Sequence, residues 1–306
     1  MKEYIHRLVG WIVSVILRGG AVHIKENFEL WEKSGYHITP VHFYSPIPDT
    51  RQLNAAYPGP SKISGIDFNR DSQQNLIQHI FPKYADEYNA IPSQASTAGI
   101  FYLNNDAFAG IDPYVYYCMI RHLQPNTIIE IGSGFSTLLG TQAIEKNTKP
   151  CTFKVVDPWP REFTQEFLSS RKQSLEYIRK RVEEVDVAFF AQLTANDILF
   201  IDTAHVVRTG GDVNFLFLEV LPTLAPGVII HIHDIFLPYD YPKEWPVDQK
   251  RFWSEQYLLQ AYLTENDHVE VLFACNWASQ IFCDELQETF PKALHIGGGS
   301  FWIRKC

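Results

Sequence analysis

The chain lacks any paired cysteine motif. It has 306 residues and five cysteines, and no two of these form a Cys-x-x-Cys pair. A zinc knuckle or a thioredoxin-like redox site is therefore not expected. Cys118 and Cys151 lie in apolar stretches and are predicted to be small buried side chains. An odd number of cysteines in a long chain fits a reducing compartment, so we predict a cytoplasmic protein.

The chain also lacks an excess of positive charge. Its formal net charge is −9 and its pI is near 5.6. Proteins that bind nucleic acid present a basic face, because neutralising phosphates dominates that affinity. The basic residues between 171 and 181 are the one local concentration, and we interpret them as a solvated surface. We therefore predict no nucleic-acid partner.

No apolar run is long enough to cross a membrane. Residues 8–17 are apolar but number ten, and a spanning helix needs about twenty. Residues 1–20 are predicted to form an amphipathic helix, whose apolar face carries Ile5, Leu8, Val9, Ile12 and Ile16. We favour docking of this helix on the protein's own core or on a second subunit, as in a homo-oligomer. Peripheral membrane contact through residues 3–18 is the alternative, and a signal peptide is the least favoured interpretation.

Three parts follow one another along the chain. After the helix over 1–20, residues 21–110 are rich in proline and aromatic residues and are predicted to be an irregular extension that covers the substrate side. Packing of this extension on the core is an equally weighted alternative. Residues 111–306 alternate between buried strands and helices. This alternation predicts an α/β fold with a doubly wound, Rossmann-like sheet of seven mostly parallel strands, which binds ligands at the carboxyl ends of its strands.

The strands and helices of residues 111–306 are expected at definite places. The predicted strands cover 127–131, 153–156, 177–183, 197–201, 228–232, 268–274 and 301–304. The predicted helices cover 112–123, 135–146, 161–171, 213–224 and 251–263.

A glycine-containing loop follows the first predicted strand. Gly132 and Gly134 allow the backbone to approach a ligand closely, and the next helix offers free N–H groups. A dinucleotide loop would have a third glycine where this chain has Thr137. Glu130 would repel a pyrophosphate but suits a cofactor that carries an ammonium and a sulfonium. Asp157 ends the next strand, where it can accept hydrogen bonds from a ribose. The predicted cofactor-binding residues are Glu130, Gly132, Ser133, Gly134, Ser136, Thr137, Asp157 and Asp202.

These motifs resemble those of the class I S-adenosylmethionine-dependent methyltransferases, in particular a bacterial branch with a His-Asp pair after strand five. The resemblance runs from about residue 28 to the end of the chain. It rests on the stretches 129–137, 155–158, 199–205, 221–238 and 35–48. It implies S-adenosyl-L-methionine as the cofactor and leaves the methyl acceptor open.

A second group of polar residues follows predicted strands four and five. Asp202 and His205 follow the fourth strand, and His231, His233 and Asp234 end the fifth. Similarity to metal-dependent methyltransferases implies a divalent metal on Asp202, His233 and Asp234, with histidine in place of a second acid. Histidine favours softer ions than Mg²⁺. Without a metal, His205 or His233 would be the general base. We interpret His231 as a core residue, and the predicted catalytic residues are Asp202, His205 and His233.

The most favoured function is O-methylation of a small-molecule or sugar-type acceptor, with or without a metal. One alternative is an iron-dependent hydroxylase on the same fold. Another is a non-catalytic binding module, which the intact loop disfavours.

Overall fold

The structure is a computed structural model that describes residues 4–5, 7–8, 11, 25–95, 99–171 and 175–306. The helix expected over residues 1–20 lies largely outside the described residues, of which those before residue 12 are helical. None of the helices among the described residues has the length and apolarity that a membrane span requires.

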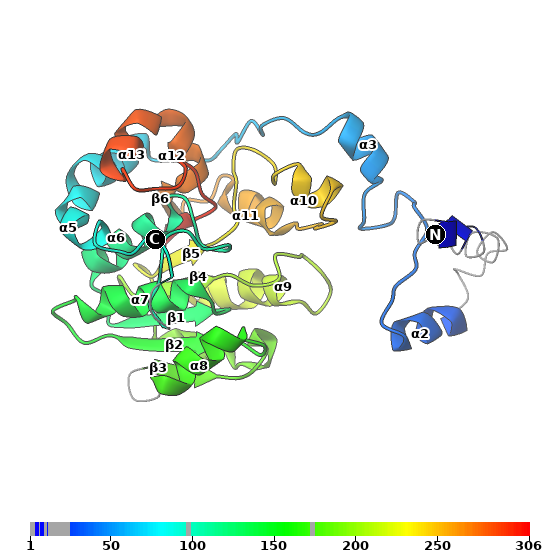
Figure 1. Cartoon of the computed structure of the whole chain (residues 1–306), viewed down its shortest axis with the longest axis horizontal. Coiled ribbons are helices and arrows are strands. Elements are labelled where there is room, and N and C mark those ends of the chain that lie inside the picture. The colour runs from blue at the N-terminus through cyan, green and yellow to red at the C-terminus, as the bar shows by residue number, and fades with distance from the viewer. Residues whose placement is uncertain (1–3, 6, 9–10, 12–24, 96–98, 172–174) are drawn as a thin grey trace.

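One seven-stranded sheet forms the centre of the molecule (Figure 1). Its strand order is β3-β2-β1-β4-β5-β7-β6, and β7 runs antiparallel to both of its neighbours. The predicted doubly wound, mostly parallel fold is therefore confirmed. The strands are β1 (Thr127–Ile131), β2 (Thr152–Val156), β3 (Leu175–Ile178), β4 (Ile198–Ile201), β5 (Ile229–Ile232), β6 (Val269–Ala274) and β7 (Phe301–Lys305).

Helices cover both faces of the sheet, and each face has its own apolar core. Because both faces are covered, β4 and β5 are buried at every position. The helices over 112–145 and 275–289 cover one face, and those over 212–223 and 255–263 cover the other. The main α-helices are α6 (Asp112–Leu123), α7 (Phe135–Glu145), α8 (Glu162–Ser170), α9 (Asp212–Phe215), α11 (Glu255–Leu263), α12 (Cys275–Ile281) and α13 (Cys283–Thr289).

Strand order places the ligand crevice. β1 and β4 are neighbours, but β1 connects to β2 on one side and β4 connects to β5 on the other, so the connections that leave these two strands run in opposite directions across the sheet. In such sheets the loops diverge at this point and leave a crevice at the carboxyl ends of the strands. The crevice is therefore expected beside the loop that follows β1.

Several predicted elements differ from the observed ones. The strand expected over 177–183 is Leu175–Ile178, and a 3-10 turn follows at Val182–Glu184. β3 is an edge strand, and the charged run after it favours solvent over pairing. The helix expected from residue 251 starts at Glu255, preceded by the short α10 (Glu244–Val247). The helix over 213–224 is interrupted by π and 3-10 turns, because Pro222 cannot continue the hydrogen-bond ladder.

Residues 25–110 consist of two structurally different parts. The later part, with α4 (Arg70–Asn75) and α5 (Ala85–Tyr88), buries Ile77, Phe81 and Tyr88 in the same core as α6. The earlier part carries α2 (Lys25–Lys33) and α3 (Thr50–Ala55) and projects from the body (Figure 1). Its end is fastened to the loop after β5, since the Tyr57 hydroxyl donates to the Tyr241 carbonyl at 2.6 Å.

Candidate functional site

The loop after β1 has a backbone shape that only glycine adopts easily. Gly132 has φ +87°, and a Cβ added there would lie 1.9 Å from the Asp202 carbonyl oxygen. The loops after β1 and β4 are thus in direct backbone contact, and the Asp202 amide donates to the Ile131 carbonyl at 2.9 Å. At Gly134 nothing lies within 4 Å of an added Cβ, so the backbone is not crowded at that position.

Glu130 lies beneath this loop and does not line the crevice. It is fully buried, and its Oε1 accepts a hydrogen bond from Ser136 Oγ at 2.5 Å. Burial raises the pKa of Glu130 to about 8, against the hydrogen bonds from Ser136 and Thr137. Thr137 Oγ1 also accepts from the Gly134 amide at 3.1 Å. These three predicted cofactor residues therefore brace the loop from inside, whereas the sequence suggested that Glu130 faces the cofactor.

A cavity of about 330 Å³ lies where the loops after β1, β2, β3 and β4 converge. The predicted residues Gly132, Ser133, Asp157 and Asp202 line it. Asp157 accepts from Ser133 Oγ at 2.5 Å and from the Trp159 amide at 2.8 Å, so its carboxylate is held in place. The cavity also has lining residues that the sequence analysis missed, because no motif marks them: Trp159, Arg161, Arg181, Val182, Glu183, Arg208 and Asp212.

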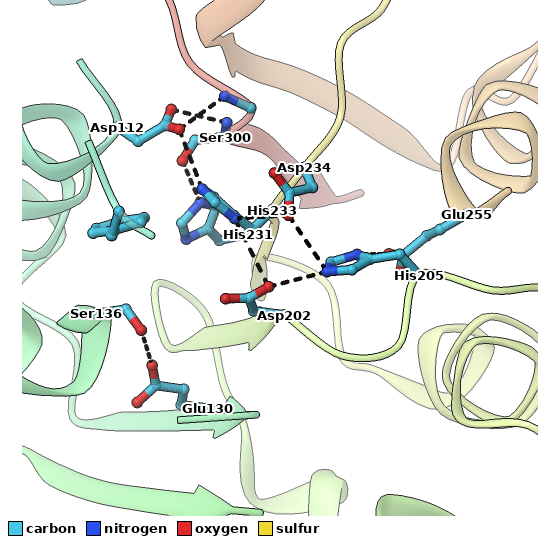
Figure 2. A network of polar contacts seen from close by, with 12 residues as sticks. Asp112, Glu130, Ser136, Asp202, His205, His231, His233, Asp234, Glu255 and Ser300 are labelled. Atoms are coloured by element: carbon cyan, nitrogen blue, oxygen red, sulfur yellow. Dashed lines mark hydrogen bonds and ion pairs between the residues drawn. The ribbon is translucent and has the colours of Figure 1, made fainter. Parts of the chain in front are cut away.

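The polar residues after β4 and β5 converge next to Asp202, which belongs to the cavity wall (Figure 2). His205 Nε2 lies 3.3 Å from Asp202 Oδ1 and 3.5 Å from Asp234 Oδ2. On the other side, His233 Nδ1 lies 3.8 Å from Asp202 Oδ1 and 3.6 Å from Asp234 Oδ2. The four residues that the sequence assigned to a functional group therefore form one cluster.

Each of these two histidines is backed by a buried carboxylate (Figure 2). His205 Nδ1 is 2.8 Å from Glu255 Oε2, and His233 Nε2 is 3.2 Å from Asp112 Oδ2. Burial disfavours the charged form of His205, but Asp202 and Glu255 outweigh it and raise its pKa to about 10. The raised pKa favours the protonated form of His205, in which Nε2 can donate to Asp202 or Asp234.

His231 belongs to the core. Its ring is stacked between Phe200 and Trp302, with centroid distances of 4.0 and 3.9 Å. Its Nε2 lies 2.8 Å from Ser300 Oγ. Burial lowers the pKa of His231 well below its usual value, so the ring is neutral. It therefore supports the sheet next to the site without facing the cavity.

A family model described as a methyltransferase domain matches residues 129–235, from within β1 to the residue after the His-Asp pair that follows β5. The chain belongs to the class I S-adenosylmethionine-dependent methyltransferases. It is also 31% identical over 206 residues to an uncharacterised protein from Archaeoglobus fulgidus, across 63% of this chain and 87% of the relative. The match to the family model identifies the chain as a methyltransferase. It does not favour the iron-dependent hydroxylase or the non-catalytic binding module.

Solved methyltransferases align with this chain at low sequence identity. An SAH-bound methyltransferase from Podospora anserina aligns with 79% of this methyltransferase and 98% of its own chain, at 14% identity and a TM-score of 0.42. An O-methyltransferase from Bacillus cereus in complex with SAH aligns with 78% and 98%, at 11% identity and a TM-score of 0.39. This similarity assigns no role to any residue of the methyltransferase described here.

Two residues of the methyltransferase's polar cluster were not assigned to it from the sequence. Glu255 begins α11 and Asp112 begins α6, and both are buried. Either residue looks like an ordinary acid in the first turn of a helix when it is read locally. No local sequence pattern indicates that an acid distant from the cofactor motif will be buried at the site. The contacts of Glu255 with His205 and of Asp112 with His233 are therefore visible only in the folded structure.

Proposed function

We propose that the protein transfers a methyl group from S-adenosylmethionine to a hydroxyl oxygen of a small-molecule or sugar-type acceptor. The observation that carries this proposal is the continuity between the two groups of residues. Gly132 and Asp157 line the cavity, Asp202 lies at its edge, and His205 and Asp234 lie directly beyond Asp202. A donor in the cavity would thus have its reactive end next to the polar cluster.

The cavity offers suitable groups for each part of the donor. Asp157 can accept hydrogen bonds from ribose hydroxyls, since it is held at the end of β2. The first turn of α7 begins just after the cavity-lining residues Gly132 and Ser133, and its backbone N–H groups would bind the donor's carboxylate. Because methyl transfer is an in-line displacement, holding the acceptor oxygen behind the methyl carbon supplies much of the rate.

The polar cluster fits a divalent metal on the acceptor side. One ligand atom each from Asp202, His233 and Asp234 lies within 4.8 Å of the others. His233 Nδ1 is buried and has no hydrogen-bond partner, although it faces both carboxylates. When bound, such an ion would lower the pKa of the acceptor hydroxyl. The residues themselves would orient the acceptor oxygen, and Asp202 would hold it beside the donor.

Calorimetry with S-adenosylmethionine tests the proposal at its first step. The wild-type protein should bind one equivalent with micromolar affinity, and Gly132→Arg should abolish binding because the backbone of Asp202 fills the space. A panel of hydroxylated acceptors with methyl-labelled donor then identifies the product. Absence of donor binding by the wild-type protein would overturn the proposal.

The described residues before residue 48 are proposed to be covered by a second copy of the chain. Among the described residues, eleven of the nineteen exposed large apolar side chains precede residue 48, including Phe43 at 82% and Tyr44 at 83% exposure. Such concentrations mark interaction surfaces. Deleting residues 1–20 should shift the protein to a smaller species in size-exclusion chromatography. If the deletion instead releases the protein from membranes without changing its size, the peripheral membrane contact is the correct alternative.

A further inference from the structure

The His233 ring has a fixed orientation. Its Nε2 lies 3.2 Å from Asp112 Oδ2, and an ionised carboxylate only accepts hydrogen bonds. The Nε2 atom therefore carries the proton that Asp112 accepts. In the neutral ring this leaves the lone pair on Nδ1, which points between Asp202 and Asp234. His233 is 5% exposed, so no bulk water is available to satisfy that nitrogen.

Asp112 is itself held rigidly. Its Oδ2 accepts from the Gly299 amide at 2.8 Å, and its Oδ1 accepts from the Ser300 amide at 2.9 Å. The chain before β7 fits closely around it, since a Cβ at Gly298 would lie 2.1 Å from Asp112 Oδ1. Burial opposes ionisation of Asp112, but these hydrogen bonds and His233 outweigh it and lower its pKa. Asp112 is therefore a fixed, charged acceptor behind the ring.

We infer that Asp112 is the positioning residue that makes Nδ1 of His233 a ligand atom of the metal centre proposed above, and that this nitrogen selects a divalent transition-metal ion over Mg²⁺. This inference rests on the proposed function and deepens it. A metal-bound histidine commonly donates its other ring N–H to a carboxylate, which fixes the ring and increases its basicity as a ligand. The pair of Asp112 and His233 has this arrangement.

The separations of the two carboxylates from the histidine nitrogen fit one ion. With metal–ligand bonds of about 2.1 Å, two atoms on the same ion can be at most about 4.2 Å apart. The separations of His233 Nδ1 from Asp202 Oδ1 and Asp234 Oδ2, 3.8 and 3.6 Å, are below this limit. One imidazole and two carboxylates favour Mn²⁺, Fe²⁺, Co²⁺ or Zn²⁺ over Mg²⁺, which prefers oxygen ligands alone.

His205 lies on the opposite side and supports the same two carboxylates. Glu255 holds its Nδ1, and its Nε2 faces Asp202 and Asp234 at 3.3 and 3.5 Å. Its carbonyl also accepts from the Ser254 amide at 2.8 Å, which ties the loop after β4 to the start of α11. His205 and Glu255 thus orient the ligand oxygens from outside, while His233 supplies the nitrogen ligand.

Metal titration of the full-length, chelator-stripped protein tests this inference without an activity readout. Calorimetry should show one Zn²⁺, Mn²⁺ or Co²⁺ per chain, with at least tenfold weaker binding of Mg²⁺, and Co²⁺ should give a visible absorption band. His233→Ala should lower the affinity at least 100-fold. Asp112→Asn should lower it 10- to 100-fold, because the ring loses its charged partner. Asp284→Asn, an exposed acid on α13, is the matched control and should change nothing.

Binding of S-adenosylmethionine by each variant confirms that it is folded. If Asp112→Asn does not fold, the comparison of wild-type protein with His233→Ala still shows whether the histidine binds the ion. The quantities to compare are the ion selectivity and the Co²⁺ absorption band. Wild-type protein that binds none of these ions below millimolar concentration, or that prefers Mg²⁺, would overturn the inference. In that case, the proposed function would still hold if the chelator-stripped protein transfers methyl groups. Failure of the wild-type protein to bind S-adenosylmethionine would contradict the proposed function, whatever the metal result.

Discussion

The cofactor end and the proposed acceptor end of the site are built in different ways. The cofactor end depends on backbone shape in one continuous loop, where Gly132 has a positive φ and touches the backbone of Asp202. The acceptor end depends on charged side chains from separate elements, with Asp112 and Glu255 behind His233 and His205. A loop that depends on backbone shape is recognisable in the sequence as a short motif with glycines. A network of buried charges from separate elements has no such motif. Mutations should therefore affect the two ends separately.

The largest effect is expected at Gly132. In Gly132→Ala the new Cβ would lie 1.9 Å from the Asp202 carbonyl oxygen in a backbone conformation that disfavours side chains. We expect donor binding to be lost and the protein to be destabilised by several kcal/mol. Calorimetry and thermal unfolding measure both. Gly134→Ala is the control, since nothing lies within 4 Å of its Cβ and its φ of −176° suits any residue. Equal damage from both variants would contradict this account of the loop.

Asp234→Asn should separate the acceptor end from the cofactor end. Asparagine tolerates the φ of +58° at this position, so the backbone should be preserved. Asp234 does not line the cavity, and the donor's Kd should change less than twofold. We expect kcat to fall about 100-fold, because the acceptor loses a charged partner. Steady-state kinetics with the acceptor found in the panel provides the test. A parallel loss of donor affinity would show that the two ends are not separable.

Glu130→Gln should show that Glu130 supports the loop from inside. The pKa of Glu130 is about 8 in the folded protein against 4.5 for an ordinary glutamate, so the unfolded chain binds fewer protons between these values. Stability of the wild type should fall as pH rises through this window. Glutamine does not titrate, so the stability of the variant relative to wild type should be about 4.5 kcal/mol higher at pH 9 than at pH 4. Urea unfolding of both proteins at both pH values measures their free energies of unfolding. If the variant and the wild type differ by the same amount at pH 4 and pH 9, the raised pKa of Glu130 is refuted.

Asp157→Asn should have the smallest effect. Asparagine keeps the acceptor oxygen for the Trp159 amide but loses the charge that ribose hydroxyls would meet. We expect donor affinity to fall about tenfold, or about 1.4 kcal/mol, with kcat at saturating donor unchanged. Ser133→Ala, which removes the hydroxyl bonded to Asp157, distinguishes an effect of charge from an effect of loop geometry. A change in kcat alone would place Asp157 outside donor binding.

Sequence patterns were most informative where structure is local. The helix over 112–123 and the strand over 127–131 have the predicted bounds, because each has a periodic apolar pattern and a clear end. The strand expected over 177–183 is wrong beyond Ile178, since charged residues at a sheet edge leave register undetermined. The small helices after β6 were missed because their pattern is short and they are held by packing against the core.

The sequence by itself determined the cofactor loop, the order of strands and helices, and the approach of Asp202 to His233 and Asp234. It could do so because alternating strands and helices place successive strand ends at one edge of the sheet. Tertiary structure alone decided that Glu130 lies beneath the loop and that Asp112 and Glu255 stand behind the two histidines. The hydrogen-bonded partners are 50 and 121 residues apart in the chain, so these contacts depend on how the helices pack. No local sequence pattern encodes this packing.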